Sequence, residues 1–206
     1  MTDAPASPWP EPGPRAPRRG GAFVRWFGRR FLRLTGWSLE GQWPDEPKLI
    51  VAVAPHTTNY DFVLTVAVNF ALNLRSSFLA KHTLFRFPFG TPLRRFGGIA
   101  VDRASTRGLV GDLVALFQHR EQLILGITPE GTRSAVRRWK TGFAQVAYGA
   151  EVPILPVTLN YDRRVIRLED PVWADADPKV TVRRVQALAS AAWPGSVDTS
   201  EDRIDG

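Results

Sequence analysis

Short apolar runs that alternate with helical patterns constrain the fold of this chain more than any other feature. The runs, typical of buried β-strands, span residues 49–55, 77–80, 97–101, 123–127 and 153–160. Helical patterns span residues 61–73, 106–120 and 141–150. Strands that alternate with helices form layered sheets, and 206 residues suffice for one domain but are short for two. We therefore predict the α/β class: a single domain with a mixed, mostly parallel sheet flanked by helices.

The two ends of the chain differ from this pattern. Six of residues 1–20 are proline, and because such a run cannot pack a core, the sequence predicts a disordered, Pro-rich tail there. At the other end, residues 196–206 are polar and are expected to fray.

Residues 21–38 are expected to form an amphipathic basic helix. The apolar residues of one face are Phe23, Phe27, Phe31 and Leu34, and the basic residues of another are Arg25, Arg29 and Arg33. Aromatic residues combined with arginine are typical of a helix that lies in a membrane interface. The alternative is a helix that packs on the domain with its arginines in solvent.

The positive charge of the chain is concentrated near its N-terminus. The net charge is +7, and residues 15–39 hold seven arginines and no acidic residue, so the rest of the chain is neutral. A basic arm indicates an anionic surface as partner. Because a nucleic-acid-binding domain usually spreads its basic charge over a folded face, we expect an anionic membrane rather than nucleic acid.

Membrane attachment is expected to be peripheral. The longest uncharged apolar stretch, residues 62–74, has 13 residues, whereas a membrane-spanning helix needs about 20. Arginines interrupt the apolar residues near the N-terminus, so no signal peptide is expected. Basic segments favour the cytoplasmic leaflet, where anionic lipids attract them, and we expect the protein on that face.

Several kinds of chemistry lose their support from the sequence. Cysteine is absent, which excludes thiol nucleophiles, disulfides and zinc–thiolate sites. The glycine motifs that hold nucleotides, the GxSxG serine elbow and the HExxH zinc motif are missing as well. We therefore expect neither a metal nor a cofactor.

His56 is placed like a catalytic base, because it follows directly on a predicted buried strand. Asp61 can meet it if His56 lies in the turn and Asp61 in the first turn of the next helix. An aspartate that accepts from one ring nitrogen fixes the tautomer and raises the basicity of the other. The alternative is a structural histidine and a helix N-terminal acid.

Two more segments end predicted strands with anion-binding side chains. Gly131, Thr132 and Arg133 follow the fourth strand and offer hydroxyl, guanidinium and backbone donors for a phosphate. Glu130, beside them, would not help to bind an anion, but it can orient Arg133 or accept from a hydroxyl. Arg103 follows the third strand, so two arginines could clamp one phosphate. Taken alone, residues 129–134 are better explained as a polar turn, and the segment with Arg103 indicates little. The alternative for Val152–Val157 is simply a strand with prolines at its edge.

The order of these segments resembles the glycerolipid acyltransferase family, of the lysophosphatidate acyltransferase type. The matching segments are HTTNYD at 56–61, GGIAVDR at 97–103, PEGTRS at 129–134 and VPILPV at 152–157. Lys81 with residues 87–90, and Lys140 with residues 141–143, also fit. The resemblance extends from about Leu49 to Tyr161 and implies an acyltransferase domain over residues 39–195.

This resemblance implies transfer of a fatty acyl group from acyl-CoA or acyl carrier protein to the hydroxyl of a lysophospholipid. His56 would be the general base and Asp61 its partner, with no covalent intermediate. Arg103 and Arg133 would bind the acceptor phosphate, Gly131 and Thr132 would close the site, and Glu130 would lie near the glycerol. Lys81 and Lys140 are further candidates for substrate contacts.

The acceptor that we expect is 1-acylglycerol 3-phosphate, which would give phosphatidic acid. One alternative is acyl transfer to another lysolipid, such as a lyso-ornithine lipid. A non-enzymatic protein that binds anionic membranes through its basic arm is a second alternative, and nucleic-acid binding through the same arm is a third.

Overall fold

The computed structural model describes residues 9–54, 60–86, 90–101, 108–129, 139–192 and 204–205. In these residues seven strands form one sheet in the order β1-β8-β7-β2-β5-β3-β4. Their bounds are β1 Ser38–Glu40, β2 Lys48–Ala54, β3 Ser76–Lys81, β4 Gly98–Val101, β5 Leu123–Ile127, β7 Ile154–Asn160 and β8 Val165–Leu168. Neighbouring strands are parallel except β7 and β8. The predicted α/β class with a mixed, mostly parallel sheet is confirmed.

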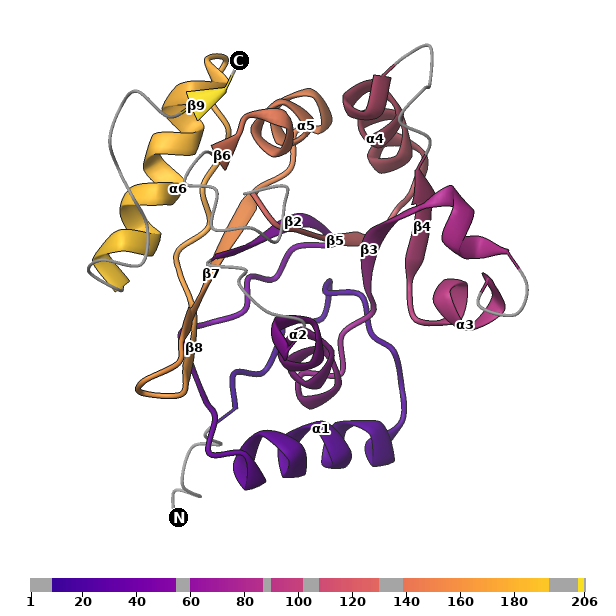
Figure 1. Ribbon diagram of the computed structural model, residues 1–206, viewed down its shortest axis with the longest axis vertical. Helices are drawn as coiled ribbons and strands as arrows, with labels where there is room; N and C mark the ends of the chain where they lie inside the picture. The colour runs from indigo at the N-terminus through magenta and orange to yellow at the C-terminus, as the bar shows by residue number, and fades with distance from the viewer. Residues whose placement is uncertain are drawn as a thin grey trace.

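Helices cover both faces of this sheet (Figure 1). Their bounds are α1 Ala22–Leu34, α2 Tyr60–Ala71, α3 Gly90–Arg95, α4 Gly108–His119, α5 Gly142–Ala150 and α6 Pro178–Ala192, with a 3₁₀ helix, η1, at His82–Phe85. Figure 1 shows α1 and α2 on one side of the sheet and α4, α5 and α6 on the other.

Strand β2 lies at the centre of the sheet and explains why its sequence is a continuous apolar run. Leu49, Val51 and Val53 belong to the core cluster formed with α1 and α2. The alternate residues of β2 belong to the cluster formed with α4, α5 and α6. Side chains of a strand point alternately to its two faces, so both sets must be apolar when helices cover both faces.

The N-terminal segment 9–20 packs on the domain, so the prediction of a disordered tail is wrong for these residues. Trp9 and Ala16 are buried, and the amide of Arg19 donates to the carbonyl of Asn73 at 3.1 Å. Arg18 forms an antiparallel bridge with Leu74. Prolines do not prevent such packing, because an extended segment needs few internal hydrogen bonds. Residues 1–8 lie outside the described residues.

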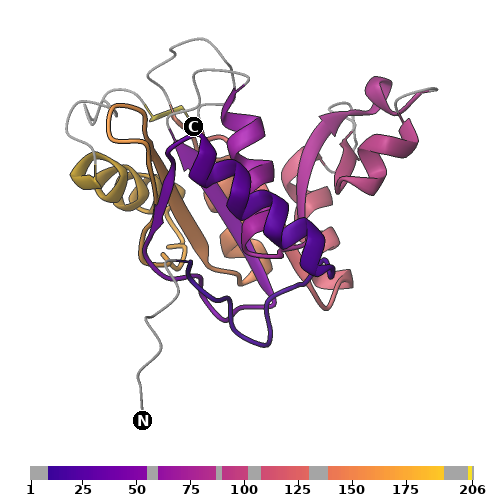
Figure 2. The same cartoon turned by 90° about the horizontal axis from the view of Figure 1, so that it is seen from below.

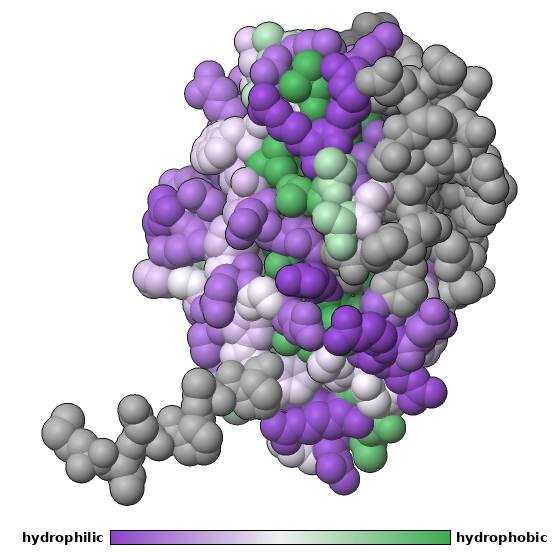
Figure 3. Space-filling view, turned by 90° about the vertical axis from the view of Figure 1, so that its left-hand side faces the viewer, coloured by the Kyte–Doolittle hydropathy of each residue, from purple (hydrophilic) through white to green (hydrophobic). Residues whose placement is uncertain are grey.

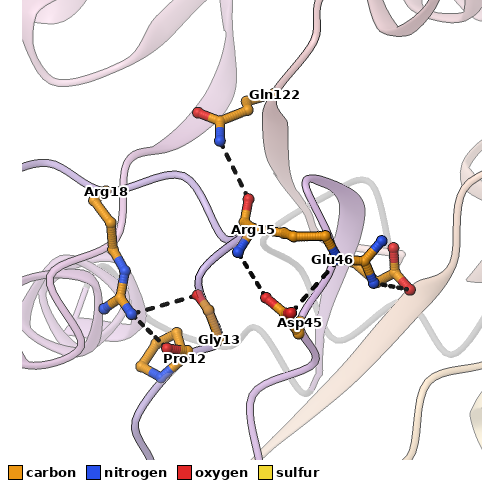
Figure 4. A network of polar contacts seen from close by, with 7 residues as sticks. All are labelled: Pro12, Gly13, Arg15, Arg18, Asp45, Glu46 and Gln122. Carbon is orange, nitrogen blue, oxygen red and sulfur yellow. Dashed lines mark hydrogen bonds and ion pairs between the residues drawn. The ribbon is translucent and has the colours of Figure 1, made fainter.

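Polar contacts tie the same segment to residues just before β2 and β5 (Figure 4). The amide of Arg15 donates to Asp45 at 2.8 Å, and its guanidinium lies 3.4 Å from Glu46. The side chain of Gln122 donates to the carbonyl of Arg15 at 3.2 Å. The prediction of disorder was based on the number of prolines. It did not consider that arginines of this segment have partners in the folded part of the chain.

Arg19 ends the segment against two aromatic rings. Its guanidinium lies 5.3 Å from the ring centre of Phe70 and 5.6 Å from that of Phe96. Burial lowers the pKa of Arg19, and the nearby charges of Arg75 and Arg95 lower it further. The attraction between a cation and an aromatic face offsets part of the hydration free energy that burial removes. Arg19 therefore contributes to the packing of this segment on the domain.

At the C-terminus, the frayed end predicted for residues 196–206 differs from the structure at Ile204–Asp205. These two residues form β9, which pairs in parallel with β6, Trp139–Lys140. The pairing satisfies backbone groups, a factor that polar composition does not reveal. The remaining residues of the predicted frayed end lie outside the described residues.

Helix α1 packs on α2 through residues that the amphipathic pattern did not single out. Gly28 and Leu32 are its buried residues, whereas Phe23 and Leu34, of the predicted apolar face, are 73% and 70% exposed. Figure 2 shows α1 as the outer layer over α2. The arginines of the helix hold the N-terminal segment, since Arg29 lies 2.7 Å from Glu11.

Gly28 sets how closely the two helices approach. A Cβ atom at this position would lie 2.4 Å from the backbone nitrogen of Ala71. We expect Gly28→Ala to lower the free energy of unfolding by about 1–3 kcal/mol, because backbone cannot move aside as a flexible side chain does. Urea denaturation measures this change.

Gly142→Ala is the matched control for that prediction. The nearest atom to a Cβ at Gly142, on Val110, is 4.0 Å away, and alanine is the better helix former. The control should therefore be neutral or stabilising. Equal stability of the two variants would contradict close packing of α1 through Gly28.

Candidate active site

The parallel strands deliver the candidate residues to one edge of the sheet. β2 pairs with β5, β5 with β3 and β3 with β4, all in parallel, so their carboxyl ends lie at the same edge. His56 follows β2 in the sequence, Glu130–Arg133 follow β5, Lys81 ends β3 and Arg103 follows β4. The topology thus directs four segments, far apart in sequence, toward one edge, where open α/β sheets bind ligands.

Spacing between strands limits how these segments can work together. Neighbouring strands lie about 4.8 Å apart, so the carboxyl ends of β2 and β5 are one spacing apart and those of β2 and β4 about 14 Å. A substrate that reaches from β2 to β4 must therefore extend over the ends of β5 and β3.

Several predicted site residues lie outside the described residues. These are His56, Arg103, Glu130, Gly131, Thr132 and Arg133. The backbone of Lys81 is described as the last residue of β3, but its side chain is not. Lys140 is exposed on β6, and its amide donates to the carbonyl of Pro129 at 2.9 Å. This bond brings Lys140 next to Pro129, two residues beyond the end of β5.

Asp61 lies in the first turn of α2 and is fully buried. It shares the inner face of the helix with Leu64, Val68 and Ala71, at the spacing of one helical stripe. A carboxylate in an apolar stripe costs several kcal/mol unless it has hydrogen-bond partners. A stable core alone would favour an apolar residue here, so Asp61 needs hydrogen-bond partners in the fold.

Tyr161, the residue directly after β7, supplies such a partner. Its hydroxyl donates to Oδ1 of Asp61. The ring of Tyr161 meets the ring of Trp37 edge-on, with centroids 5.3 Å apart and planes at 87°. The sequence prediction did not single out Tyr161, although a polar aromatic residue directly after a buried strand was the available signal.

A cavity of about 460 Å³ opens beside this pair, and its lining residues are Thr35, Trp37, Tyr60, Tyr161 and Arg164. Arg164 reaches its rim with a left-handed backbone (φ 52°) and donates to the carbonyl of Thr35 at 3.1 Å. The cavity therefore joins the end of α1 to the turn between β7 and β8. Figure 3 shows the side of the molecule that lies on the left in Figure 1, where hydrophilic residues surround smaller apolar patches.

β7 itself carries the fourth predicted segment. The sequence allowed a strand with prolines at its edge, but β7 is an inner strand between β2 and β8. Pro156 stands opposite Ala52 of β2 in the parallel register, and its carbonyl accepts from the amide of Glu169 at 3.0 Å. Proline keeps its acceptor, so the sheet loses only one donor at this position.

In the part of the chain that the structure describes, no helix has the length and apolar character needed to cross a membrane.

Three comparisons relate the chain to known proteins. A family model described as Acyltransferase matches residues 42–160. The 1-acyl-sn-glycerol-3-phosphate acyltransferase of Haemophilus influenzae is 30% identical over 161 residues, which cover 74% of this chain and 65% of that protein. The Escherichia coli protein of the same name is 29% identical over 165 residues, covering 75% and 65%. The chain thus spans about 65% of the length of these relatives.

A solved structure shares the fold. The crystal structure of the 1-acyl-sn-glycerophosphate (LPA) acyltransferase PlsC from Thermotoga maritima aligns with a TM-score of 0.59 at 18% identity. The alignment covers 82% of this chain and 76% of that one. The arrangement of sheet and helices is therefore that of a known architecture.

Proposed function

Because the chain belongs to the acyltransferase family, we propose that it transfers a fatty acyl group from an acyl thioester to a lysophospholipid hydroxyl. The acceptor proposed is 1-acylglycerol 3-phosphate and the product phosphatidic acid, in keeping with the names of the curated relatives. The observation that carries the proposal is the buried Asp61 at the start of α2, five residues after His56.

In the proposed mechanism, His56 is the general base and Asp61 orients it. The imidazole takes the proton of the acceptor hydroxyl while the hydroxyl oxygen attacks the carbonyl carbon of the thioester. The C–S bond then breaks, and the leaving thiolate takes the proton from the imidazolium. No enzyme nucleophile is needed, which agrees with the absence of cysteine from the sequence. The thioester, from acyl-CoA or acyl carrier protein, is a co-substrate rather than a cofactor.

Basic residues at the same edge of the sheet are proposed to hold the acceptor. Arg103 and Arg133 bind its phosphate, because guanidinium groups pair with phosphate in a bidentate manner. Gly131 and Thr132 close the site around it, and Glu130 contacts the glycerol. Lys81 and Lys140 contact the donor or the phosphate.

Acceptor-dependent thiol release tests this function. The protein is mixed with oleoyl-CoA, or with oleoyl acyl carrier protein, on anionic vesicles that contain lysophosphatidate, lyso-ornithine lipid or no acceptor. Release that requires lysophosphatidate supports the proposal and identifies the donor. Release only with lyso-ornithine lipid would mean that this lipid, and not lysophosphatidate, is the acceptor. Release without any acceptor would indicate a thioesterase.

The exposed face of α1 is proposed to bind the membrane as a peripheral contact, on the cytoplasmic leaflet. Phe23, Trp26, Phe27 and Leu34 are all exposed there, together with Arg30 and Arg33. These six residues recur at spacings of three and four, so they form one continuous face. Apolar side chains beside arginines fit the boundary between acyl chains and anionic head groups.

Replacing Phe23 and Phe27 by serine should lower partitioning onto anionic vesicles about 10²-fold. The variant loses the free energy gained when the two phenyl rings move from water into the membrane interface. Vesicle cosedimentation measures this change. Tyr148 and Trp173, exposed aromatic residues outside α1, give the control when both are replaced by serine. Equal partitioning of the two double variants would contradict attachment through α1.

A further inference from the structure

Asp61 and Tyr161 come from elements that the fold brings together on one face of the sheet. Val157 and Leu159 of β7 point into the core under α1 and α2, and Tyr161 packs against the same cluster. The period of two along a strand explains why these three alternate residues share a face. Tyr161 is therefore directed toward α2, whose first buried residue is Asp61.

The turn after β7 and the end of α1 hold the tyrosine ring in place. The side chain of Asn160 accepts from the amide of Arg163 at 2.7 Å, which shapes the turn that begins at Tyr161. On the other side, Gly36 takes a left-handed conformation (φ 76°), and the amide of Trp37 donates to the carbonyl of Leu32 at 2.8 Å. This helix termination turns the indole inward, where it packs edge-on against Tyr161.

We propose that Tyr161 is a positioning residue, whose hydroxyl orients the Asp61 carboxylate so that it can accept a hydrogen bond from His56. A donor on one carboxylate oxygen fixes the rotation of the group and so the direction of its remaining lone pairs. The geometry of the base then depends on a residue 100 positions away in the sequence. The inference rests on the proposed function, because it assigns Asp61 to a catalytic pair.

The test is a double-mutant cycle between Tyr161→Phe and Asp61→Asn. Phenylalanine keeps the ring against Trp37 and removes only the hydroxyl. Hydrogen bonds to charged groups are among the stronger ones in proteins, so we expect Tyr161→Phe to lower kcat about 10-fold while both KM values stay within about twofold. In the Asp61→Asn background, the same change should alter kcat by less than about twofold.

The control is Tyr148→Phe, which removes a hydroxyl from an exposed tyrosine on α5 and should leave the rate unchanged. A Tyr161→Phe protein with wild-type kcat would overturn the inference, as would equal losses in both backgrounds. Loss of folding in Tyr161→Phe, seen in the near-ultraviolet circular dichroism, would make the hydroxyl structural and overturn it too.

Failure of the proposed function would look different. The parent protein would then release no thiol in response to lysophosphatidate. If it does release thiol but His56→Ala and Asp61→Asn both keep full activity, the catalytic pair falls, whatever Tyr161→Phe does. If those two variants lose activity and Tyr161→Phe does not, the catalytic pair stands and only the role of Tyr161 falls.

Discussion

Replacing His56 by alanine should lower kcat/KM for acyl transfer about 10²- to 10⁴-fold, the range typical of a lost general base. The acceptor hydroxyl is a weak nucleophile until its proton is removed. The sequence offers three histidines, and only His56 follows the central strand β2, immediately before the helix that carries the buried Asp61. The initial rate of acceptor-dependent thiol release measures the loss.

His119→Ala is the matched control, because His119 is exposed at the end of α4, away from the strand ends that carry the candidate residues. We expect it to keep the wild-type rate. Thermal unfolding of both variants should stay close to that of the parent protein. A folded His56→Ala protein with wild-type activity would contradict the assignment of the base.

Asp61→Asn should lower kcat about 10²-fold or more and leave the fold intact. Asparagine has the shape of aspartate, and its amide oxygen can still accept from the Tyr161 hydroxyl, so the packing of α2 should survive. The neutral amide, however, no longer stabilises the imidazolium that forms when His56 takes a proton. The kcat of the purified variant measures this effect.

Asp170→Asn serves as its control, since Asp170 is exposed after β8 and should tolerate the change without loss of rate. If both aspartate variants kept full activity, Asp61 would be a structural acid held by Tyr161 and nothing more. If Asp61→Asn failed to fold, Asp61→Glu, which keeps the charge and moves it by one methylene, would be compared at the same temperature.

The central strands could be predicted from the sequence because burial on both faces leaves a clear pattern. Residues 48–54 are apolar almost without interruption, as expected of a short strand with helices on both faces. β4, at one edge of the sheet, was still predicted because its four residues are apolar or glycine, but β1 and β8, at the other edge, could not be predicted in the same way. β1 and β8 have three and four residues, too few for a periodic pattern to stand out.

α6 was missed although its start carries a signal. Asp177 accepts from the amide of Lys179 at 2.9 Å, and Pro178 is the first residue of the helix. An aspartate cap followed by proline is a known helix start. The β-branched residues that follow, from Val180 to Val182, weaken the helical pattern there, and packing of Val182 and Val185 in the core offsets that preference.

The candidate site could be predicted only in part, for a physical reason. His56 and Asp61 lie close in sequence, and the strand–turn–helix arrangement restricts how they can meet. Tyr161 reaches Asp61 through the sheet register, which no local pattern encodes. Gly28 poses the same difficulty, because its role depends on how closely the backbone of α2 approaches.

Direct identification of the product tests the central claim most directly. The protein would be incubated with ¹³C-labelled oleoyl thioester and lysophosphatidate on anionic vesicles, and the lipids analysed by mass spectrometry. The account predicts phosphatidic acid that carries the labelled chain, formed by the parent protein and lost in His56→Ala. Labelled free oleate in place of phosphatidic acid, or equal product from His56→Ala, would contradict it.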